Sequence, residues 1–454
     1  MVLSGYSGKK MKILCIISGG AAFVNSGITG LATGCSHFGF ELFGAINGYS
    51  PVLSQGEFNL RPINLELGKR VQNQPGSILG CSKPRPLPSS TDDFDRIAEQ
   101  IIKEGFDGVV TIGGDSSLEI SAEVKKACQR KDKHISVLLI GKTLDDDIAI
   151  KYDTAHTMGN RSSVQNLCQQ MQNISHSSSM AAHNRFDLIV LPGRESGRNS
   201  ASCASTVTNL ATFIGEEFPK GITYENFIRL LEAVVIKSFI SPTSPGNGLI
   251  CVSEGLIESI VDKPPLSYDA GPFGTFPVGN TGDGHGHVVH ADYPFGAITA
   301  LVLSKRLHDL GLNKHLNELT QGGEFQIRSH ALGPTAQSVS PVFVDSRIGL
   351  NCGFAAIEAI RNNKDTIVIT LNGETIVKTP FSDLKKEGQR TQTRGVDLDS
   401  DVWRIITKRR TVLTQDDISS QETLETIQNI FNGLASQEVI RKRYKEPLAL
   451  LTRN

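Results

Sequence analysis

The sequence predicts an α/β protein with two doubly wound domains whose sheets are mainly parallel. Six short apolar runs rich in β-branched residues each end at a turn sequence, and continuous runs of this kind are typical of strands buried on both faces. Amphipathic helical patterns such as residues 92–105 alternate with them, which favours parallel sheets covered by helices. At 454 residues the chain is too long for one ordinary core, so at least two domains are expected.

The expected strands follow one another with a turn after each. They are residues 12–17 before Ser18-Gly19-Gly20, 108–112 before Gly113-Gly114-Asp115, 136–140 before Gly141-Lys142, 187–191 before Pro192-Gly193-Arg194, 248–252 before Ser253-Glu254-Gly255, and 366–371 before Asn372-Gly373. Residues 261–294 are rich in glycine, proline and histidine and predict a long loop. A helical pattern at 437–451 ends the chain.

Composition argues against several classes of protein. Lys and Arg total 46 against 47 Asp and Glu, a net charge of -1, so no global field recruits nucleic acid or an anionic membrane. No apolar stretch reaches the roughly 18 residues of a membrane span, and the apolar run at 13–17 is too short for a signal peptide. A cytoplasmic protein is therefore expected.

The eight cysteines stand far apart with no C-x-x-C pair, which favours reduced, mostly buried thiols over zinc ligands or disulfides. His285, His287 and His290 lie close together in the long loop. A glycine-rich loop lacks the spacing of helical metal ligands, so these histidines are not assigned to a metal site.

Two glycine pairs stand where a parallel sheet binds ligands, beyond the carboxyl ends of its strands. Gly113-Gly114 can let a phosphate approach the backbone, and Asp115 can hold Mg2+ against it. Ser116 and Ser117 can cap the following helix, although a simple tight turn is an equally open interpretation. Gly19-Gly20 carries the same two interpretations.

Three consecutive carboxylates, Asp145 to Asp147, directly follow a predicted strand. Adjacent carboxylates repel one another unless a cation or a reaction uses them. Asp145 and Asp147 can take a proton from an attacking hydroxyl and assist Mg2+, while Lys142 neutralises phosphate charge; the alternative is a solvated acidic turn. Arg185, Arg194 and Arg328 could together bind two anionic groups.

Eight segments, in order along nearly the whole chain, resemble the phosphofructokinases of the glycolytic, doubly wound class. The segments are SGGAAFVNSGITG (18–30), GAINGYSPVL (44–53), GSILGCSKP (76–84), IGGDSSLE (112–119), GKTLDDDI (141–148), LPGRESG (191–197), VSEG (252–255) and IRSHALGPTAQSVSP (327–341). The resemblance implies that Asp145 is the base that deprotonates the sugar hydroxyl and that Asp147 assists with the metal. Thr143 would contact the sugar or the transferred phosphoryl group, Asp115 would bind Mg2+, and Arg194 would stabilise the transition state.

The resemblance also implies a substrate site and a division of the chain. Glu254 would hydrogen-bond the sugar, while Arg185 and Arg328 would reach its 6-phosphate across a subunit boundary, as in a homodimer or homotetramer. The expected donor site comprises Gly19, Gly20, Lys83, Gly114, Ser116, Ser117 and Lys142. Residues 1–155 with about 330–375 would bind the phosphoryl donor and Mg2+, and residues about 156–329 with 376–454 would bind the sugar phosphate.

Departures from the family pattern bear on substrate and donor. Pro192 replaces a usual methionine. Pro334 and Gln337 replace a usual histidine and a usual arginine, so the 6-phosphate pocket loses two phosphate ligands unless a residue such as His330 takes their place. Another acceptor, such as sedoheptulose 7-phosphate, therefore stays open. Lysine at 142 is typical of pyrophosphate enzymes because it takes the room of an ATP α-phosphate, but Ser116 leaves ATP open.

The sequence thus predicts Mg2+-dependent phosphoryl transfer to the 1-hydroxyl of fructose 6-phosphate in glycolysis, with pyrophosphate favoured over ATP as donor. The alternatives are the same chemistry on another sugar phosphate and a non-catalytic regulatory homologue. A base beside a metal site argues against the regulatory homologue, since a purely regulatory chain would not need one.

Overall fold

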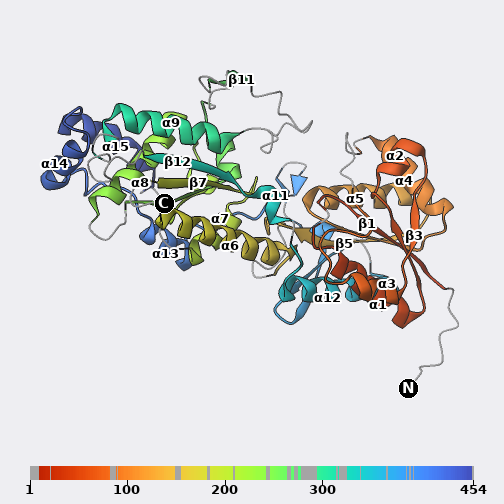
Figure 1. Ribbon diagram of the computed structural model, residues 1–454. Coiled ribbons are helices and arrows are strands. Elements are labelled where there is room, and N and C mark those ends of the chain that lie inside the picture. Colours follow the sequence, from red (N-terminus) through yellow and green to blue (C-terminus); the bar gives the residue numbers. More distant parts are fainter. Residues whose placement is uncertain are drawn as a thin grey trace. The chain divides into compact units, whose positions relative to one another are not determined.

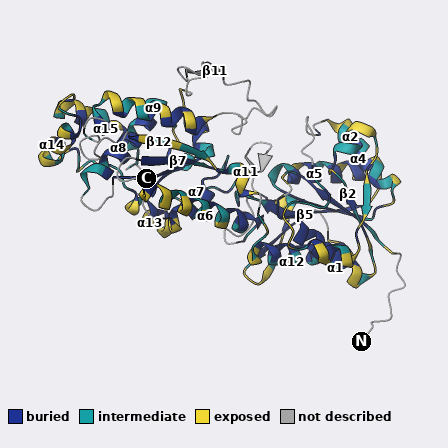
Figure 2. Cartoon of the chain, in the orientation of Figure 1, coloured by how far each residue is buried: buried dark blue, intermediate teal, exposed yellow. Residues whose placement is uncertain are grey.

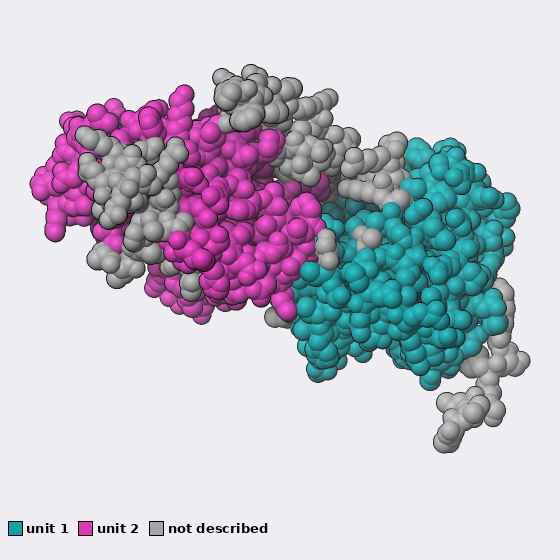
Figure 3. All heavy atoms as spheres, in the orientation of Figure 1, with its two compact units in different colours: residues 1–163, 337–394 teal, residues 164–336, 395–454 magenta. Residues whose placement is uncertain are grey.

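The structure is a computed structural model of the chain. It describes residues 10–20, 22–81, 88, 90–148, 155–180, 185–207, 210–241, 246–262, 267–269, 275–277, 294–312, 315, 325–337, 339–364, 367–384, 386–387, 390–391 and 393–451. The chain divides into two compact units (Figure 3), namely residues 1–163 with 337–394 and residues 164–336 with 395–454. Each unit is therefore assembled from separate stretches of sequence.

The observed bounds of the units differ from the expected ones. Residues 156–163 and 376–394 belong to the first unit, and residues 330–336 belong to the second. The strand β14 (Thr375–Pro380) stays with the first unit because it pairs antiparallel with β13 (Ile367–Asn372) at the end of the first sheet. Local sequence patterns do not show which strands pair, so they could not place this boundary.

An eight-stranded sheet forms the first unit, in the order β14-β13-β5-β4-β1-β2-β3, with β6 paired to β5. The remaining strands are β1 (Lys12–Ile17), β2 (Glu41–Ala45), β3 (Leu60–Pro62), β4 (Gly108–Gly113), β5 (Ser136–Thr143) and β6 (Met158–Gly159). All neighbours from β13 to β2 are parallel, and β14 and β3 are antiparallel to their partners. The expected mainly parallel sheet is confirmed.

Helices cover both faces of this sheet (Figure 1). On β1, Ile13, Cys15 and Ile17 pack with α1 (Asn25–Phe38) and α12 (Phe343–Arg361), whereas Leu14 and Ile16 pack with α4 (Thr91–Lys103) and α5 (Asp115–Arg130). The two short helices are α2 (Ser50–Gln55) and α3 (Leu65–Val71). These five β1 side chains have no exposed area, which explains why the strand is apolar without alternation. Figure 2 colours the chain by burial and draws the neighbouring strand β5 mostly as buried.

The second unit holds a four-stranded parallel sheet in the order β12-β7-β9-β8. Its strands are β7 (Arg185–Leu191), β8 (Leu210–Phe213), β9 (Gly248–Ser253) and β12 (Gln326–Ala331). Phe186 and Leu188 pack with α8 (Tyr224–Ile240) and α9 (Phe295–Asp309), while Ile189 and Leu191 pack with α6 (Asn160–Ser179), α7 (Arg198–Thr206) and α13 (Asp401–Arg409). This sheet too is doubly wound, as expected.

Short elements complete the described chain. They are β10 (Ser267–Asp269), β11 (Thr275–Pro277), α11 (Gly333–Ala336), β15 (Lys386–Glu387), β16 (Arg390–Thr391), and the 3-10 turns Gly215–Glu217 (η1), Glu254–Ser259 (η2) and Phe381–Asp383 (η5). Most of the expected 261–294 loop, including its three histidines, lies outside the described residues.

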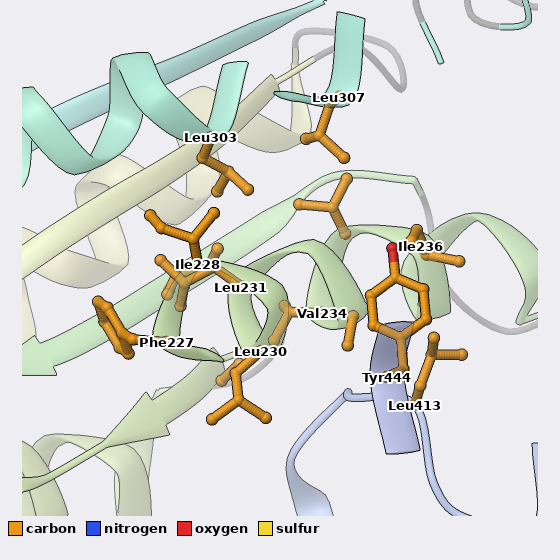
Figure 4. Packing of buried hydrophobic residues seen from close by; sticks show 14 of the residues in the cluster. Phe227, Ile228, Leu230, Leu231, Val234, Ile236, Leu303, Leu307, Leu413 and Tyr444 are labelled. Atoms are coloured by element: carbon orange, nitrogen blue, oxygen red, sulfur yellow. The ribbon is translucent and has the colours of Figure 1, made fainter. Parts of the chain in front are cut away.

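The carboxyl-terminal segment belongs to the core of the second unit. α14 (Gln421–Ile430) and α15 (Gln437–Leu451) pack against α8, and Tyr444 of α15 lies among the apolar side chains of α8 (Figure 4). Glu232 of α8 is fully buried and accepts two hydrogen bonds of 2.7 Å from the guanidinium of Arg443. The helical pattern expected at 437–451 is confirmed.

Two other expectations concern the whole chain. No helix among the described residues is long and apolar enough to cross a membrane. All eight cysteines lie in described segments as free thiols, and all but Cys81 and Cys168 are buried. The expectation of mostly buried cysteines is confirmed.

Candidate active site

Three loops meet at the carboxyl edge of the first sheet. β1, β4 and β5 are parallel neighbours, so the residues that follow them emerge at one edge. Gly19 turns the chain after β1 with a left-handed φ of 84°, which glycine adopts without strain. Gly113 ends β4, Gly114 caps α5, and Asp115 is the first residue of that helix. The structure thus brings both glycine pairs and the carboxylate segment together.

The three aspartates do not share one environment. Asp146 has a left-handed φ of 53° and is only 2% exposed. Its carboxylate lies 2.8 Å from the guanidinium of Arg394 and accepts hydrogen bonds from the backbone N–H and the hydroxyl of Thr157. The middle carboxylate is therefore neutralised inside the protein, whereas Asp145 and Asp147 are half-buried.

Thr143 links the outer two aspartates. Its hydroxyl donates to Asp147 Oδ1 at 2.7 Å, and its oxygen accepts the backbone N–H of Asp145 at 3.2 Å. The Asp147 carboxylate, the Thr143 hydroxyl and the backbone of Asp145 are thus held together at the end of β5. Such a group can accept a proton and hold a cation, which is the chemistry expected from the sequence.

Lys142 crosses from β5 to the first glycine loop. Its ammonium donates to the carbonyl oxygen of Gly20 at 2.6 Å, and the residue is only 5% exposed. Burial lowers the pKa of Lys142 to about 8, and the charges of Asp145 and Asp147 offset part of that effect. A side chain at Gly20 would meet this ammonium, because its Cβ would lie 3.2 Å from Nζ and 3.4 Å from Gln337 Oε1.

The serines after Asp115 take different positions from those expected. α5 begins at Asp115 with Gly114 as its amino-terminal cap, so Ser116 and Ser117 lie inside the first turn and do not cap the helix. Ser117 is buried and donates to the carbonyl oxygen of Ser18 at 3.4 Å, which joins the two glycine loops. The expectation of serine caps was wrong because Gly114 takes up the extended cap conformation itself.

In the second unit, Arg194 and Glu254 lie at the carboxyl edge of the sheet. β7 and β9 are parallel, with Leu191 opposite Ser253, so the residues after each strand emerge together. The backbone N–H of Gly255 donates to the Gly193 carbonyl at 3.0 Å. A Cβ at Gly255 would lie only 2.1 Å from the Arg194 carbonyl oxygen, so glycine is required for this close approach.

Arg185 and Arg328 occupy the other end of the same sheet. Arg185 begins β7, and β12 pairs beside it with Gln326 opposite Arg185 and Arg328 opposite Asp187. Arg185 is buried and lies 3.2 Å from the Asp187 carboxylate, while Arg328 is exposed. The structure therefore groups the two arginines with each other and separates them from Arg194 and Glu254 by the length of β7.

A buried carboxylate organises this arginine end of the sheet. Asp187 accepts hydrogen bonds from Ser178 Oγ and lies 2.7 Å from His330 Nε2. Burial raises the pKa of Asp187, but His330, Ser178 and Arg185 outweigh burial and hold it below its usual value. With Arg328 and His330, the edge strand presents two basic side chains at alternate positions of one face.

Sequence reasoning missed two of these groups. Arg394 lies 248 residues from Asp146, and no local signal connects them. Asp187 could have been noticed, because it stands two residues from Arg185 and so faces the same side of a strand. Lys83, an expected donor ligand, lies outside the described residues.

The chain matches a known protein family over most of its length. The phosphofructokinase family profile matches residues 12–360. The chain belongs to the phosphofructokinase family. The resemblance seen in the sequence is thereby confirmed over most of the chain.

Relatives within the phosphofructokinase family use either donor according to their names. The pyrophosphate--fructose 6-phosphate 1-phosphotransferase of Naegleria fowleri is 24% identical over 90% of this chain and 90% of its own length. The ATP-dependent 6-phosphofructokinase of Entamoeba histolytica is 25% identical over 78% of this chain and 71% of its own.

A solved structure shows the same fold. Pichia pastoris phosphofructokinase in the T-state superposes with a TM-score of 0.61 at 16% identity over 98% of this chain. This chain spans only 40% of the length of the yeast protein. At this identity the likeness supports the phosphofructokinase fold alone.

Proposed function

We propose that this chain transfers a phosphoryl group to the 1-hydroxyl of fructose 6-phosphate and forms fructose 1,6-bisphosphate. One observation carries the proposal: Asp146 is neutralised by Arg394, while Thr143 ties Asp145 and Asp147 together at the sheet edge. Thr143 thus keeps Asp145 and Asp147 in one arrangement at the end of β5, whereas the alternative interpretation of the sequence was a solvated acidic turn. Its relatives bear the names of fructose 6-phosphate enzymes.

Asp145 is the proposed base. As the sugar hydroxyl attacks, Asp145 accepts its proton, since a half-buried carboxylate at a strand end can reach a bound hydroxyl. Thr143 holds the segment in place through its bonds to Asp145 and Asp147. Arg194 is proposed to stabilise charge on the transferred group and Glu254 to hydrogen-bond the sugar, as the family pattern suggests.

Asp115 and Asp147 are the residues that would hold Mg2+. No group of three His, Cys, Asp or Glu side chains suited to a metal is found among the described residues. Mg2+ usually takes one or two carboxylates together with waters and substrate phosphates, and Asp115 and Asp147 follow the neighbouring parallel strands β4 and β5 at one edge of the sheet. When bound, the ion neutralises phosphate charge during transfer.

Pyrophosphate is the proposed donor. The Lys142 side chain is buried and its ammonium donates to the Gly20 carbonyl, so a positive charge lies at the first glycine loop. A compact anion gains from that charge, whereas a bulkier nucleotide loses the room that the side chain occupies. ATP is the alternative, because one relative is named as ATP-dependent.

Arg185, Arg328 and His330 are the proposed ligands of the sugar 6-phosphate. Two of them offer guanidinium groups suited to phosphate. The Asp187 carboxylate orients His330 through its hydrogen bond with Nε2 of the imidazole. Because these residues lie at the opposite end of the sheet from Arg194, we propose that they serve a neighbouring subunit in a cytoplasmic homodimer or homotetramer.

The test is 31P NMR of the purified protein with fructose 6-phosphate and Mg2+, supplied with pyrophosphate in one tube and ATP in another. Fructose 1,6-bisphosphate should form with pyrophosphate. Formation with ATP alone reverses the donor assignment, and no product with either donor contradicts the proposal. Asp145→Asn should slow turnover about 100-fold or more, while Asp92→Asn, an exposed aspartate of α4, should leave it unchanged.

A further inference from the structure

Two cysteine sulfurs meet in the second unit, away from the residues assigned above. Cys168 Sγ on α6 lies 3.5 Å from Cys203 Sγ on α7. Cys203 is fully buried, whereas Cys168 is half-buried and its sulfur lies 3.2 Å from the Thr206 hydroxyl. Both helices pack in one apolar cluster with Leu167, Ala204 and their neighbours.

We propose that Cys168 and Cys203 form a thiol pair that a hydroperoxide oxidises to an intramolecular disulfide. Cys168 is the thiol that the oxidant reaches, and Cys203 resolves the product from inside. A disulfide needs sulfurs about 2 Å apart, so side-chain rotation and a small helix shift must close about 1.5 Å. No other residue has to leave its place between the two sulfurs, since they are already in contact.

The surroundings of Cys168 favour its reactive form. The Cys203 thiol and the Thr206 hydroxyl lower the pKa of Cys168 to about 6, although burial opposes them. The contact with Cys168 and burial raise the pKa of Cys203. These opposite shifts favour the thiolate at Cys168 and the thiol at Cys203, which is the combination that a resolving pair needs.

The chemistry balances with a hydroperoxide as the oxidant. The Cys168 thiolate attacks the peroxide O–O bond, forming a sulfenic acid and releasing hydroxide, or alkoxide from an organic peroxide. The Cys203 sulfur then attacks the sulfenic sulfur, which forms the S–S bond and expels the sulfenic oxygen as water. Two thiols lose two electrons in all, and the peroxide is reduced by two.

The disulfide would act on the Arg194 loop, a step that rests on the proposed function. Asn199 precedes Cys203 by one turn of α7, so the two lie on the same helix face. Asn199 Nδ2 donates to the Pro192 carbonyl at 3.0 Å, two residues before Arg194. Pulling Cys203 toward α6 therefore displaces the residue that holds the loop of a proposed catalytic arginine.

The first test uses the whole reduced protein, one equivalent of hydrogen peroxide, and peptide mass mapping. The expected product is a Cys168–Cys203 cross-linked peptide pair lighter by two hydrogens. The matched control is Cys81, the other half-buried cysteine. Before oxidation, iodoacetamide at pH 7 should label Cys168 at least about tenfold faster than it labels Cys81. Equal labelling rates, or oxidation that stops at an unlinked Cys168, would overturn the pair.

Variants separate the two thiols. In Cys203→Ser, peroxide should leave a Cys168 sulfenic acid that dimedone traps, whereas Cys168→Ser should show no trapped sulfur and no cross-link. If either variant does not fold, the cross-link map of the unaltered protein still decides. A disulfide between other cysteines contradicts the proposal.

The second test follows turnover during oxidation. Activity should fall in proportion to the cross-linked fraction and return with dithiothreitol, and peroxide should leave Cys168→Ser active. Full cross-linking with unchanged turnover overturns the coupling to Arg194. If the reduced protein has no kinase activity, the proposed function fails, and mapping alone still decides the thiol pair.

Discussion

At the scale of single residues, Asp146 has a structural role that differs from the proposed catalytic roles of its neighbours Asp145 and Asp147. A left-handed φ of 53° turns its carboxylate into the interior, where Arg394 lies 2.8 Å away. Arg394 also donates to the backbone oxygens of Asp146 and Ala155. The pair therefore fixes the loop that carries Asp145 and Asp147.

Asp146→Asn should destabilise the protein by about 3–5 kcal/mol, because it leaves the Arg394 charge buried without its partner. Asparagine tolerates a left-handed backbone, so the change tests charge and not conformation. Urea unfolding measures the effect, with the exposed Asp92→Asn as the control. The double variant, Asp146→Asn with Arg394→Met, should lose far less free energy of unfolding than the two single variants lose together. Additive losses would contradict a direct ion pair.

Lys142 gives a pH dependence whose sign follows from its buried charge. Its pKa falls from 10.5 to about 8 on folding, so between these values the unfolded chain binds more protons. Raising the pH through that window therefore stabilises the folded state, by up to about 3 kcal/mol from this residue. Lowering the pH through 8 removes this contribution.

Lys142→Met should remove this part of the pH dependence. The measurement is the free energy of unfolding in urea at pH 7.5 and pH 10, for both proteins. Other titrating groups contribute equally to the two proteins, so the gain on raising the pH should be smaller in the variant. An identical gain would show that Lys142 is protonated as readily in the folded protein as in the unfolded chain.

At the scale of elements, the turns after β7 and β9 hold each other by backbone contact. The N–H of Gly255 donates to the Gly193 carbonyl, and no side chain fits between them. The position of Arg194 thus depends on β9, a strand that comes much later in the chain. Neither turn alone contains that information.

Gly255→Ala should lower turnover about 100-fold, since displacing a catalytic group by about 1 Å has an effect of this size. Thermal unfolding monitored by circular dichroism separates this from loss of fold. Gly333→Ala is the matched control, because a Cβ there meets no atom within 4 Å. Equal turnover in the two variants would show that the Arg194 loop does not need this close approach.

At the scale of the whole molecule, each unit is completed by a later part of the chain. α12 and β13 both come from residues 337–394, yet β13 pairs with β5 and α12 packs directly on α1. A Cβ at Gly30 would lie 2.4 Å from the Leu350 carbonyl oxygen, so these helices touch at their backbones. Residues 1–163 alone lack half of that interface.

Residues 1–163 joined to 337–394 by a short glycine-serine linker should fold cooperatively, whereas 1–163 alone should not. A short linker suffices because the Val342 N–H donates to Ser162 Oγ at 2.9 Å. Differential scanning calorimetry distinguishes the two chains by the presence of a sharp transition. A cooperative transition in 1–163 alone would contradict the shared core.

Six of the strands, the tail helix and the segments that carry chemistry could be predicted from local sequence patterns. Buried parallel strands are apolar throughout, and strand ends concentrate glycine and charge, so both features appear as local patterns. The family motifs around Asp115 and Asp145 depend on spacing within a few residues, which a linear sequence preserves.

The task of each residue in those segments depends on contacts that form only when the chain folds. Which of three adjacent aspartates is neutralised depends on Arg394, and whether Arg185 lies beside Arg194 or Arg328 depends on strand pairing. The two thiols at 168 and 203 likewise meet only because α6 and α7 pack on one face of a sheet. Such contacts join residues far apart in the chain, and the free energy that selects them comes from packing the core, which no local pattern records.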